Sequence, residues 1–283
     1  MISRYTLTNM RKKILLSLLA LIGFNLTEAQ RLKTWKKSTD NIKFHLDSIT
    51  GLGEIDASIR PSDEKIQYTI YRLQISAPPY GLTKVRELCY SLKAMEDSPI
   101  DTTKITEEQK SYRQLSLREK FTYNMIHPEW YRQICSSMPI ILYEDKKIFA
   151  QLPNPFAEHG WSEQQSKFFI YHRDSVVVFL RDCVAKGLRV GVNFKHVIVN
   201  VNAKELIPIV ISTYKLQKKD HDILTVLMLL MRNSGYKPFV ASSLYKSLYA
   251  DEHASYKSSV DWTFENEALI IKLSNNFYNG LGK

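Results

Sequence analysis

The stretch that decides the fold is AKELIPIVISTYKLQ at residues 203–217, followed after a short polar turn by HDILTVLMLLM at residues 221–231. Both segments are dense in apolar residues, and the Lys-Lys-Asp turn at 218–220 separates them. Asn202 stands where a helix cap is expected, and Pro208 can be accommodated only in a first turn or at a kink. The pattern therefore predicts two consecutive helices joined by a tight turn.

This helix pair resembles a helical-repeat unit of the HEAT kind, in pattern only, over about 35 residues and without a diagnostic motif. The resemblance implies antiparallel helix pairs that stack on one another. We therefore predict a mainly α fold of the α+β type, with a small N-terminal β segment and a short central hairpin.

Capping residues and three-to-four spacing of apolar residues predict further helices upstream. Ser116 with Glu119 forms a capping-box pattern, Ser162 is a second cap, and Gly187 is a stop signal. The stretch 190–202 fits either a strand or a helix. The predicted upstream helices cover residues 83–98, 116–125, 128–134, 162–171 and 175–187.

Strand signals are fewer. Residues 66–75 alternate and are rich in β-branched and aromatic side chains, which favours a strand, and residues 44–49 are a weaker candidate partner. Residues 140–143 and 148–152 read as a hairpin. The break at Pro78 and Pro79 then suggests three regions after residue 29: a β-rich segment at 30–80, a helical region with the hairpin at 81–152, and a helical, repeat-like region at 153–283.

One internal similarity is a candidate repeat. Phe121-x-Tyr123 precedes Cys135 as Phe169-x-Tyr171 precedes Cys183, with an offset of 48 throughout. Helix-pair repeats of about this period are known, and chance can also produce three matched positions. Both explanations of residues 121–135 and 169–183 stay open.

The N-terminus has the organisation of a secretory signal peptide. Four basic residues within 1–13 precede the apolar run ILLSLLALIGF at 14–24, and small and polar residues follow up to Ala29. The run is too short for a membrane span, and no later segment is long enough for one. We expect cleavage after Ala29 and a secreted or periplasmic location.

Charge changes with that cleavage. The chain of 283 residues has 39 basic and 29 acidic residues, a formal charge of +10. Loss of residues 1–29 leaves 35 basic against 28 acidic residues and a charge of +7. The only basic concentration without acids is at 31–37, where Arg31, Lys33, Lys36 and Lys37 surround Trp35. This stretch could adhere to an anionic surface, or serve solubility alone.

Familiar catalytic signatures are absent from the sequence. There is no Gly-x-Ser-x-Gly elbow, no phosphate-binding glycine loop and no His-Glu-x-x-His pair, so we predict no cofactor and no metal. Asp220-His221-Asp222 is the densest ligand-like triplet, and helix capping explains it better than metal binding. Cys89, Cys135 and Cys183 permit buried free thiols or one disulfide at most.

Two acids stand beside tryptophans. Glu129 precedes Trp130, and Glu158 lies close to Trp161, so either carboxylate could be desolvated by an indole or act beside a bound sugar. The simpler interpretation makes Glu129 a first-turn helix residue and the tryptophans core residues. Glu129 is thus the catalytic candidate, and Trp35, Trp130 and Trp161 are the binding candidates.

The function expected from these patterns is an exported, non-enzymatic protein that binds another protein, for instance an inhibitor or immunity protein in the cell envelope. The alternative is an envelope polymer or glycan hydrolase that uses paired carboxylates. The partner of the first and the substrate of the second are not encoded in any motif, and no feature indicates specific binding of nucleic acid.

Overall fold

A computed structural model describes residues 64–96, 110–131, 141, 143–156, 159–249 and 258–281. All of them belong to one compact unit, residues 56–283. This unit is mainly helical with two small antiparallel sheets, as predicted. The helices are α2 (Glu64–Leu73), α3 (Leu82–Glu96), α5 (Leu117–Ile126), α6 (Glu163–Tyr171), α7 (Arg173–Ala185), α8 (Val192–Asn200), α9 (Ile207–Gln217), α10 (Asp222–Asn233), α11 (Lys237–Val240), α12 (Ser243–Tyr249) and α13 (Phe264–Gly280).

The shorter elements of the described residues are two single-turn 3₁₀ helices and four strands. They are η2 (Glu144–Lys146), η3 (Lys204–Leu206), β1 (Trp130–Tyr131), β2 (Lys147–Phe149), β3 (His159–Gly160) and β4 (Ser259–Asp261). No helix in the described ranges combines the length and the apolar character needed to cross a membrane.

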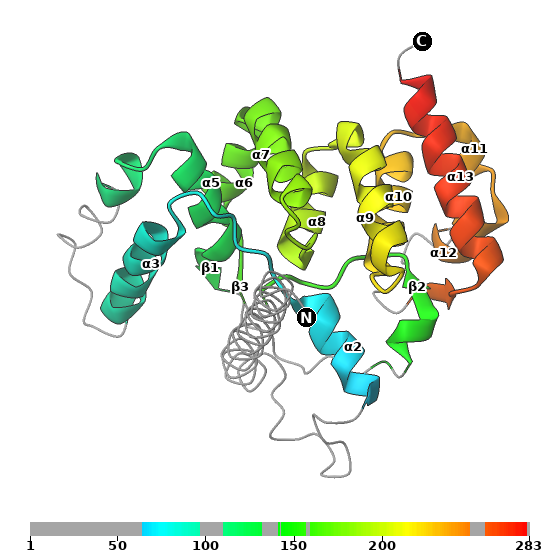
Figure 1. The fold of residues 1–283 in the computed structure, drawn as a ribbon, viewed down its shortest axis with the longest axis horizontal. Coiled ribbons are helices and arrows are strands. Elements are labelled where there is room, and N and C mark those ends of the chain that lie inside the picture. The colour runs from blue at the N-terminus through cyan, green and yellow to red at the C-terminus, as the bar shows by residue number, and fades with distance from the viewer. Residues whose placement is uncertain are drawn as a thin grey trace, which may run out of the picture. The chain divides into compact units, whose positions relative to one another are not determined.

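Helix α10 is the centre of the main core. It contacts α8, α9, α11, α13 and β2, and its neighbours α9 and α13 are visible beside it in Figure 1. Its side chains from Asp222 to Met228 are all buried, which is the pattern of a helix enclosed on every side. The predicted pair at 203–231 is therefore confirmed as the core of the fold.

Two residues with unusual backbone requirements, Asn202 and Pro208, lie between the end of α8 and the first turn of α9. Residues 192–200, which fitted strand or helix, form α8, and Asn202 follows it with a left-handed φ of 50°. Asn tolerates this conformation better than most residues, so it turns the chain between the helices instead of capping the second one. Pro208 lies in the first turn of α9, where its missing N–H breaks no helical hydrogen bond.

The predicted capping box at Ser116 and the predicted cap at Ser162 are confirmed, and the cap at Ser162 is a capping box as well. Ser116 accepts a hydrogen bond from the Glu119 N–H and the Glu119 side chain accepts one from the Ser116 N–H; Ser162 and Gln165 make the same exchange at α6. Gly187 follows α7 with a φ of 84°, as a stop signal should. By contrast, the helix predicted from Pro128 is wrong, because Trp130 and Tyr131 form β1.

The strand predicted at 66–75 is also wrong, since residues 64–73 form α2. The buried side chains of this segment are Tyr68 and Arg72. Positions i and i+4 share a face in a strand and in a helix alike, so this spacing does not separate the two. The helix is stabilised by its tertiary contacts with α10 and η2.

Both sheets join segments distant in sequence. In the first, Trp130 pairs with Gly160 and Tyr131 with His159. In the second, β2 pairs with β4, with Ile148 opposite Val260. A strand does form in the region of the predicted hairpin, but its partner is β4 and not residues 140–143, of which 141 and 143 are described and lie outside any strand.

The candidate repeat gains no support. Helix α5, which carries Phe121, is followed by β1, whereas α6, which carries Phe169, is followed by α7. The element order therefore differs between the two segments. Cys135 lies outside the described residues.

The segment after α2 is fastened to the start of α8. Ser76 N–H donates to Asn193 Oδ1 at 2.9 Å, and Asn193 Nδ2 donates back to the Ser76 carbonyl at 2.8 Å. Val192 N–H donates to the Gln74 carbonyl at 3.0 Å. The fit is close at Gly191, where a Cβ would stand 2.4 Å from the Ser76 nitrogen. Glycine is therefore required at this crossing.

Candidate functional site

Several sequence candidates lie outside the described residues. These are the predicted signal peptide, Trp35 with the basic residues Arg31, Lys33, Lys36 and Lys37, and the acid Glu158. The remaining candidates, Glu129, Trp130, Trp161 and the 220–222 triplet, occupy three different places.

Trp161 is an anchor of the core. Its ring makes edge contacts with Phe156 and Phe169, each at a centroid distance of 5.3 Å. Its Nε1–H donates to the Asn124 carbonyl at 2.6 Å. The indole is thus held from several sides, with its one donor satisfied.

Glu129 is exposed, and its position is set by α5 and α6 together. Its N–H donates to Gln165 Oε1 at 3.1 Å, and its Oε2 accepts from Ser162 Oγ at 2.6 Å. On the other side, burial first and then the charge and hydrogen bond of Glu129 raise the pKa of Tyr123. The carboxylate is therefore fixed at the surface between two hydroxyl groups.

Beside this carboxylate, β1 presents two aromatic rings to solvent. Trp130 is 49% exposed and Tyr131 is 58% exposed. Tyr131 makes an edge contact with His159 at 5.4 Å, while the residue opposite Trp130 is Gly160, which has no side chain to cover the indole. We call Glu129, Trp130, Tyr131 and His159 the Trp130 surface.

The 220–222 triplet belongs to a buried ion cluster, made of Arg72, Glu144, Lys195, Asp220 and Asp222. Arg72 donates to both oxygens of Asp222 at 2.8–3.1 Å and lies 3.1 Å from Glu144 Oε1. Lys195 Nζ lies 2.5 Å from Asp220 Oδ1 and 3.7 Å from Asp222 Oδ2. The sequence predicts that this triplet caps the helix, but no side-chain cap is made at the start of α10.

Pairing favours the charged forms of Arg72 and Asp222 in spite of burial. Lys195 and Asp222 are 0% and 1% exposed in their side chains. Burial opposes ionisation of Asp222, but Arg72 and Lys195 outweigh it and lower the pKa of this carboxyl below its usual value. For Arg72, burial likewise works against the charge, and Asp222 and Glu144 together raise its pKa.

His221 lies beside the cluster as a neutral side chain. Its ring stacks on Trp262 at a centroid distance of 5.0 Å and an angle of 8°. Burial lowers its pKa in spite of Asp222. Its N–H donates to the Tyr68 hydroxyl at 3.1 Å, so the start of α10 is held to α2 by backbone as well as by charge.

Sequence reasoning missed Arg72 and Lys195. Each is a single cation within an otherwise apolar stretch, IYRLQI at 70–75 and NFKHVIV at 193–199. A cation in a segment that is about to be buried needs an acid, so this pattern could have predicted ion pairs.

The contacts of the ion cluster favour a structural role over a catalytic one. The carboxylates that lie close together are all neutralised by Arg72 or Lys195. Among the described residues no group of three or more His, Cys, Asp or Glu is placed to hold a metal. Cys89 and Cys183 are free thiols, and burial raises the pKa of Cys89 to about 11, so this thiol is protonated at neutral pH.

The chain matches no protein-family model, no curated protein and no solved structure.

Proposed function

We propose that this protein is an exported, non-enzymatic protein that acts by binding another protein, and that the Trp130 surface is the centre of the contact. The carrying observation is that Trp130 and Tyr131, two adjacent large aromatic residues, are about half exposed beside a fixed carboxylate.

Trp and Tyr are the residue types that dominate interface energies. They supply a large contact area at a low cost in conformational entropy, because each has only two side-chain torsions. The antiparallel pairing of β1 with β3 restrains their backbone. A partner therefore meets a surface that needs little ordering on binding.

Glu129 supports a partner that presents a basic side chain. Its carboxylate is already oriented by Ser162 and Tyr123, so an arginine or lysine of the partner can add a charge-assisted hydrogen bond. A flanking aliphatic or aromatic side chain of that partner would cover the Trp130 indole. An inhibitor or immunity protein of the cell envelope is the concrete form of this proposal.

The test is capture of a partner from the native envelope fraction by the full chain, with cross-linking, followed by measurement of its affinity. Trp130→Ala is expected to weaken that affinity at least tenfold, as truncation of a central aromatic anchor does. The matched control is Tyr171→Ala, which truncates a 77% exposed aromatic on another element and should leave the affinity unchanged. Equal affinity of the two variants would contradict the proposal.

The alternative hypothesis, a glycan hydrolase, requires a second carboxyl group near Glu129. In the described part of the chain, the Glu129 carboxylate accepts hydrogen bonds from the hydroxyl groups of Ser162 and Tyr123. Glu129→Gln distinguishes the two hypotheses: a glycan-cleaving activity that this substitution abolishes would favour the hydrolase, and weakened partner binding without such an activity favours the binding protein.

A further inference from the structure

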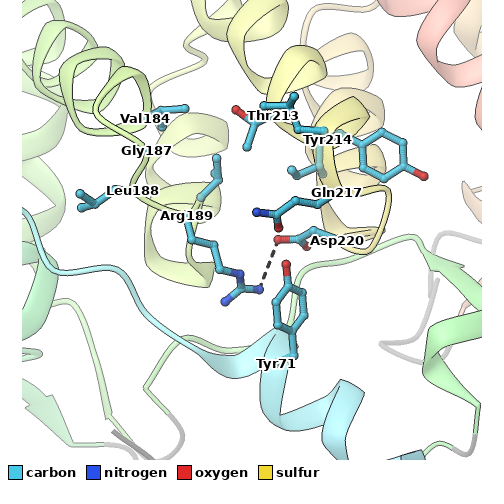
Figure 2. A pocket seen from close by; sticks show the side chains of 12 residues that line it. Tyr71, Val184, Gly187, Leu188, Arg189, Thr213, Tyr214, Gln217 and Asp220 are labelled. Atoms are coloured by element: carbon cyan, nitrogen blue, oxygen red, sulfur yellow. Dashed lines mark hydrogen bonds and ion pairs between the residues drawn. The ribbon is translucent and has the colours of Figure 1, made fainter. Parts of the chain in front are cut away.

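A pocket of about 170 Å³ lies between the end of α7, the loop at 187–190 and α9. Figure 2 shows its lining, with Val184 and Thr213 at one end and Arg189, Asp220 and Tyr71 at the other. The pocket and the Trp130 surface have no residue in common.

One end of the pocket is apolar. Val184 lies there, and the other apolar residues that line the pocket include Leu188, Val190 and Ile223; all of these but Leu188 are buried. A closed apolar cavity of about 150 Å³ is large enough to hold benzene. The apolar end can therefore receive a ring or a branched aliphatic group, and water gains little there.

The other end is polar and has hydrogen-bonding capacity that the described residues do not use. Arg189 donates to Asp220 Oδ2 at 3.2 Å and to the Gln74 carbonyl at 3.2 Å, but its Nε is buried without a partner among the described residues. The Tyr71 hydroxyl is also buried, interacts with the Arg189 guanidinium and donates to no described residue. Figure 2 shows this hydroxyl and the Gln217 amide pointing toward the Arg189–Asp220 pair.

The charges at this end favour an anion. The Arg189 guanidinium lies 3.7 Å from the centre of the Tyr71 ring, and the Lys219 ammonium lies 4.9 Å from it. The nearest acid, Asp220, is already shared by Lys195 and Arg189. With the rest of the ion cluster included, the four cations Arg72, Lys195, Arg189 and Lys219 face the three acids Glu144, Asp220 and Asp222. One positive charge is therefore in excess, and an additional negative charge is stabilised.

We propose that this pocket is a binding site for a small organic monocarboxylate whose apolar body is about the size of a benzene ring. The carboxylate accepts hydrogen bonds from Arg189 Nε, Tyr71 OH and the Gln217 amide, and the apolar body lies against Val184 and Leu188. The site would satisfy two buried polar atoms and fill an apolar space with the same molecule.

The experiment is a titration of the full chain, methyl-labelled at Val and Leu, with phenylacetate, followed by NMR at the Val184 and Leu188 methyl groups. Phenylacetate is expected to give saturable shifts with a dissociation constant on the order of 1 mM or below. Phenylacetamide and 2-phenylethylamine keep the ring but replace the carboxylate with a neutral amide and a positively charged ammonium group, respectively. Both should bind at least tenfold more weakly than phenylacetate.

Two variants test the polar end. Tyr71→Phe removes only the hydroxyl and keeps the ring under Arg189, and Gln217→Leu changes an exposed helix end at nearly constant shape. Each should weaken phenylacetate binding about tenfold, as loss of one hydrogen bond to a charged group does. The matched control, Tyr171→Phe on α6, should bind like the unaltered chain.

The proposal is overturned if no saturable shift occurs at these methyl groups up to about 20 mM phenylacetate. It is equally overturned if the amide and the amine bind as well as the acid, or if both variants bind as tightly as the control. Leu188→Trp, which fills the pocket from a half-exposed position, should abolish the shifts at Val184 while the rest of the methyl spectrum is kept.

Discussion

Replacement of Arg72 by methionine should destabilise the unit strongly, because one guanidinium holds two buried carboxylates. Arg72 bonds both oxygens of Asp222 and contacts Glu144, and all three side chains are less than one-tenth exposed. Removing one partner of a buried ion pair costs about 3–5 kcal/mol, because the other charge stays behind. The guanidinium also lies 4.0 Å above the Phe149 ring, a contact worth up to about 2 kcal/mol that methionine keeps only as packing.

Lys195 moderates this loss. Its ammonium stays 3.7 Å from Asp222, so that carboxylate retains a counter-ion, while Glu144 keeps the Thr69 hydroxyl at 2.9 Å. We therefore expect a loss of about 4 kcal/mol in the free energy of unfolding for Arg72→Met. With a urea dependence of about 2 kcal/mol per molar, the midpoint of urea unfolding falls by about 2 M.

The assay is urea unfolding at pH 7, followed by circular dichroism. Arg181→Met, at an exposed position of α7, is the matched control and should change the free energy by no more than about 0.5 kcal/mol. A triple variant, Arg72→Met with Glu144→Gln and Asp222→Asn, removes both carboxylates that Arg72 pairs with and should recover at least half of the loss. A loss below about 1 kcal/mol for Arg72→Met, or a triple variant no better than the single one, would refute the reasoning.

Three further predictions follow from the fold. Burial lowers the pKa of His221 below its value of about 6.5 in the unfolded chain, so the unfolded chain binds more protons than the folded one as the pH falls toward 5. The melting temperature should therefore fall between pH 7 and pH 5. In His221→Phe this fall should be smaller. Gly191→Ala places a Cβ against the Ser76 nitrogen and should cost more than about 2 kcal/mol in urea unfolding, whereas Gly187→Ala, where only the positive φ opposes the change, should cost about 1 kcal/mol. Ser116→Ala removes one capping box and should lower the free energy of unfolding by about 1 kcal/mol, measured in the same assay.

Local signals predicted a large part of the helical fold. The capping box at Ser116, the cap at Ser162 and the stop at Gly187 each involve residues that are neighbours in sequence, so a few residues suffice to predict them. The densely apolar segment at 221–231 likewise identified the core helix, because only burial on every side suits such a composition.

The remaining features depend on distant partners. The β2–β4 pairing joins residues 147–149 to 259–261, and no local pattern specifies a strand's partner at that separation. For α2, the four-residue spacing of Tyr68 and Arg72 fits both periods, and propensity alone favoured the wrong one. The candidate site shows the same limit: Glu129 beside Trp130 is visible in sequence, but the meeting of Arg72 with Asp222 is not.

The position of Arg72 in the chain sets an order of events during synthesis. Its acceptor, Asp222, is 150 residues further on. At about 5–20 residues per second, the ribosome needs about 8–30 s to make that acceptor after α2 has been made. Until Asp222 has been made, Arg72 can meet only Glu144, the nearer in sequence of its two buried counter-charges, and Ser76 waits for Asn193, which is 117 residues further on. The first described helix therefore docks only after α8 and α10 exist, so this end of the unit is completed late.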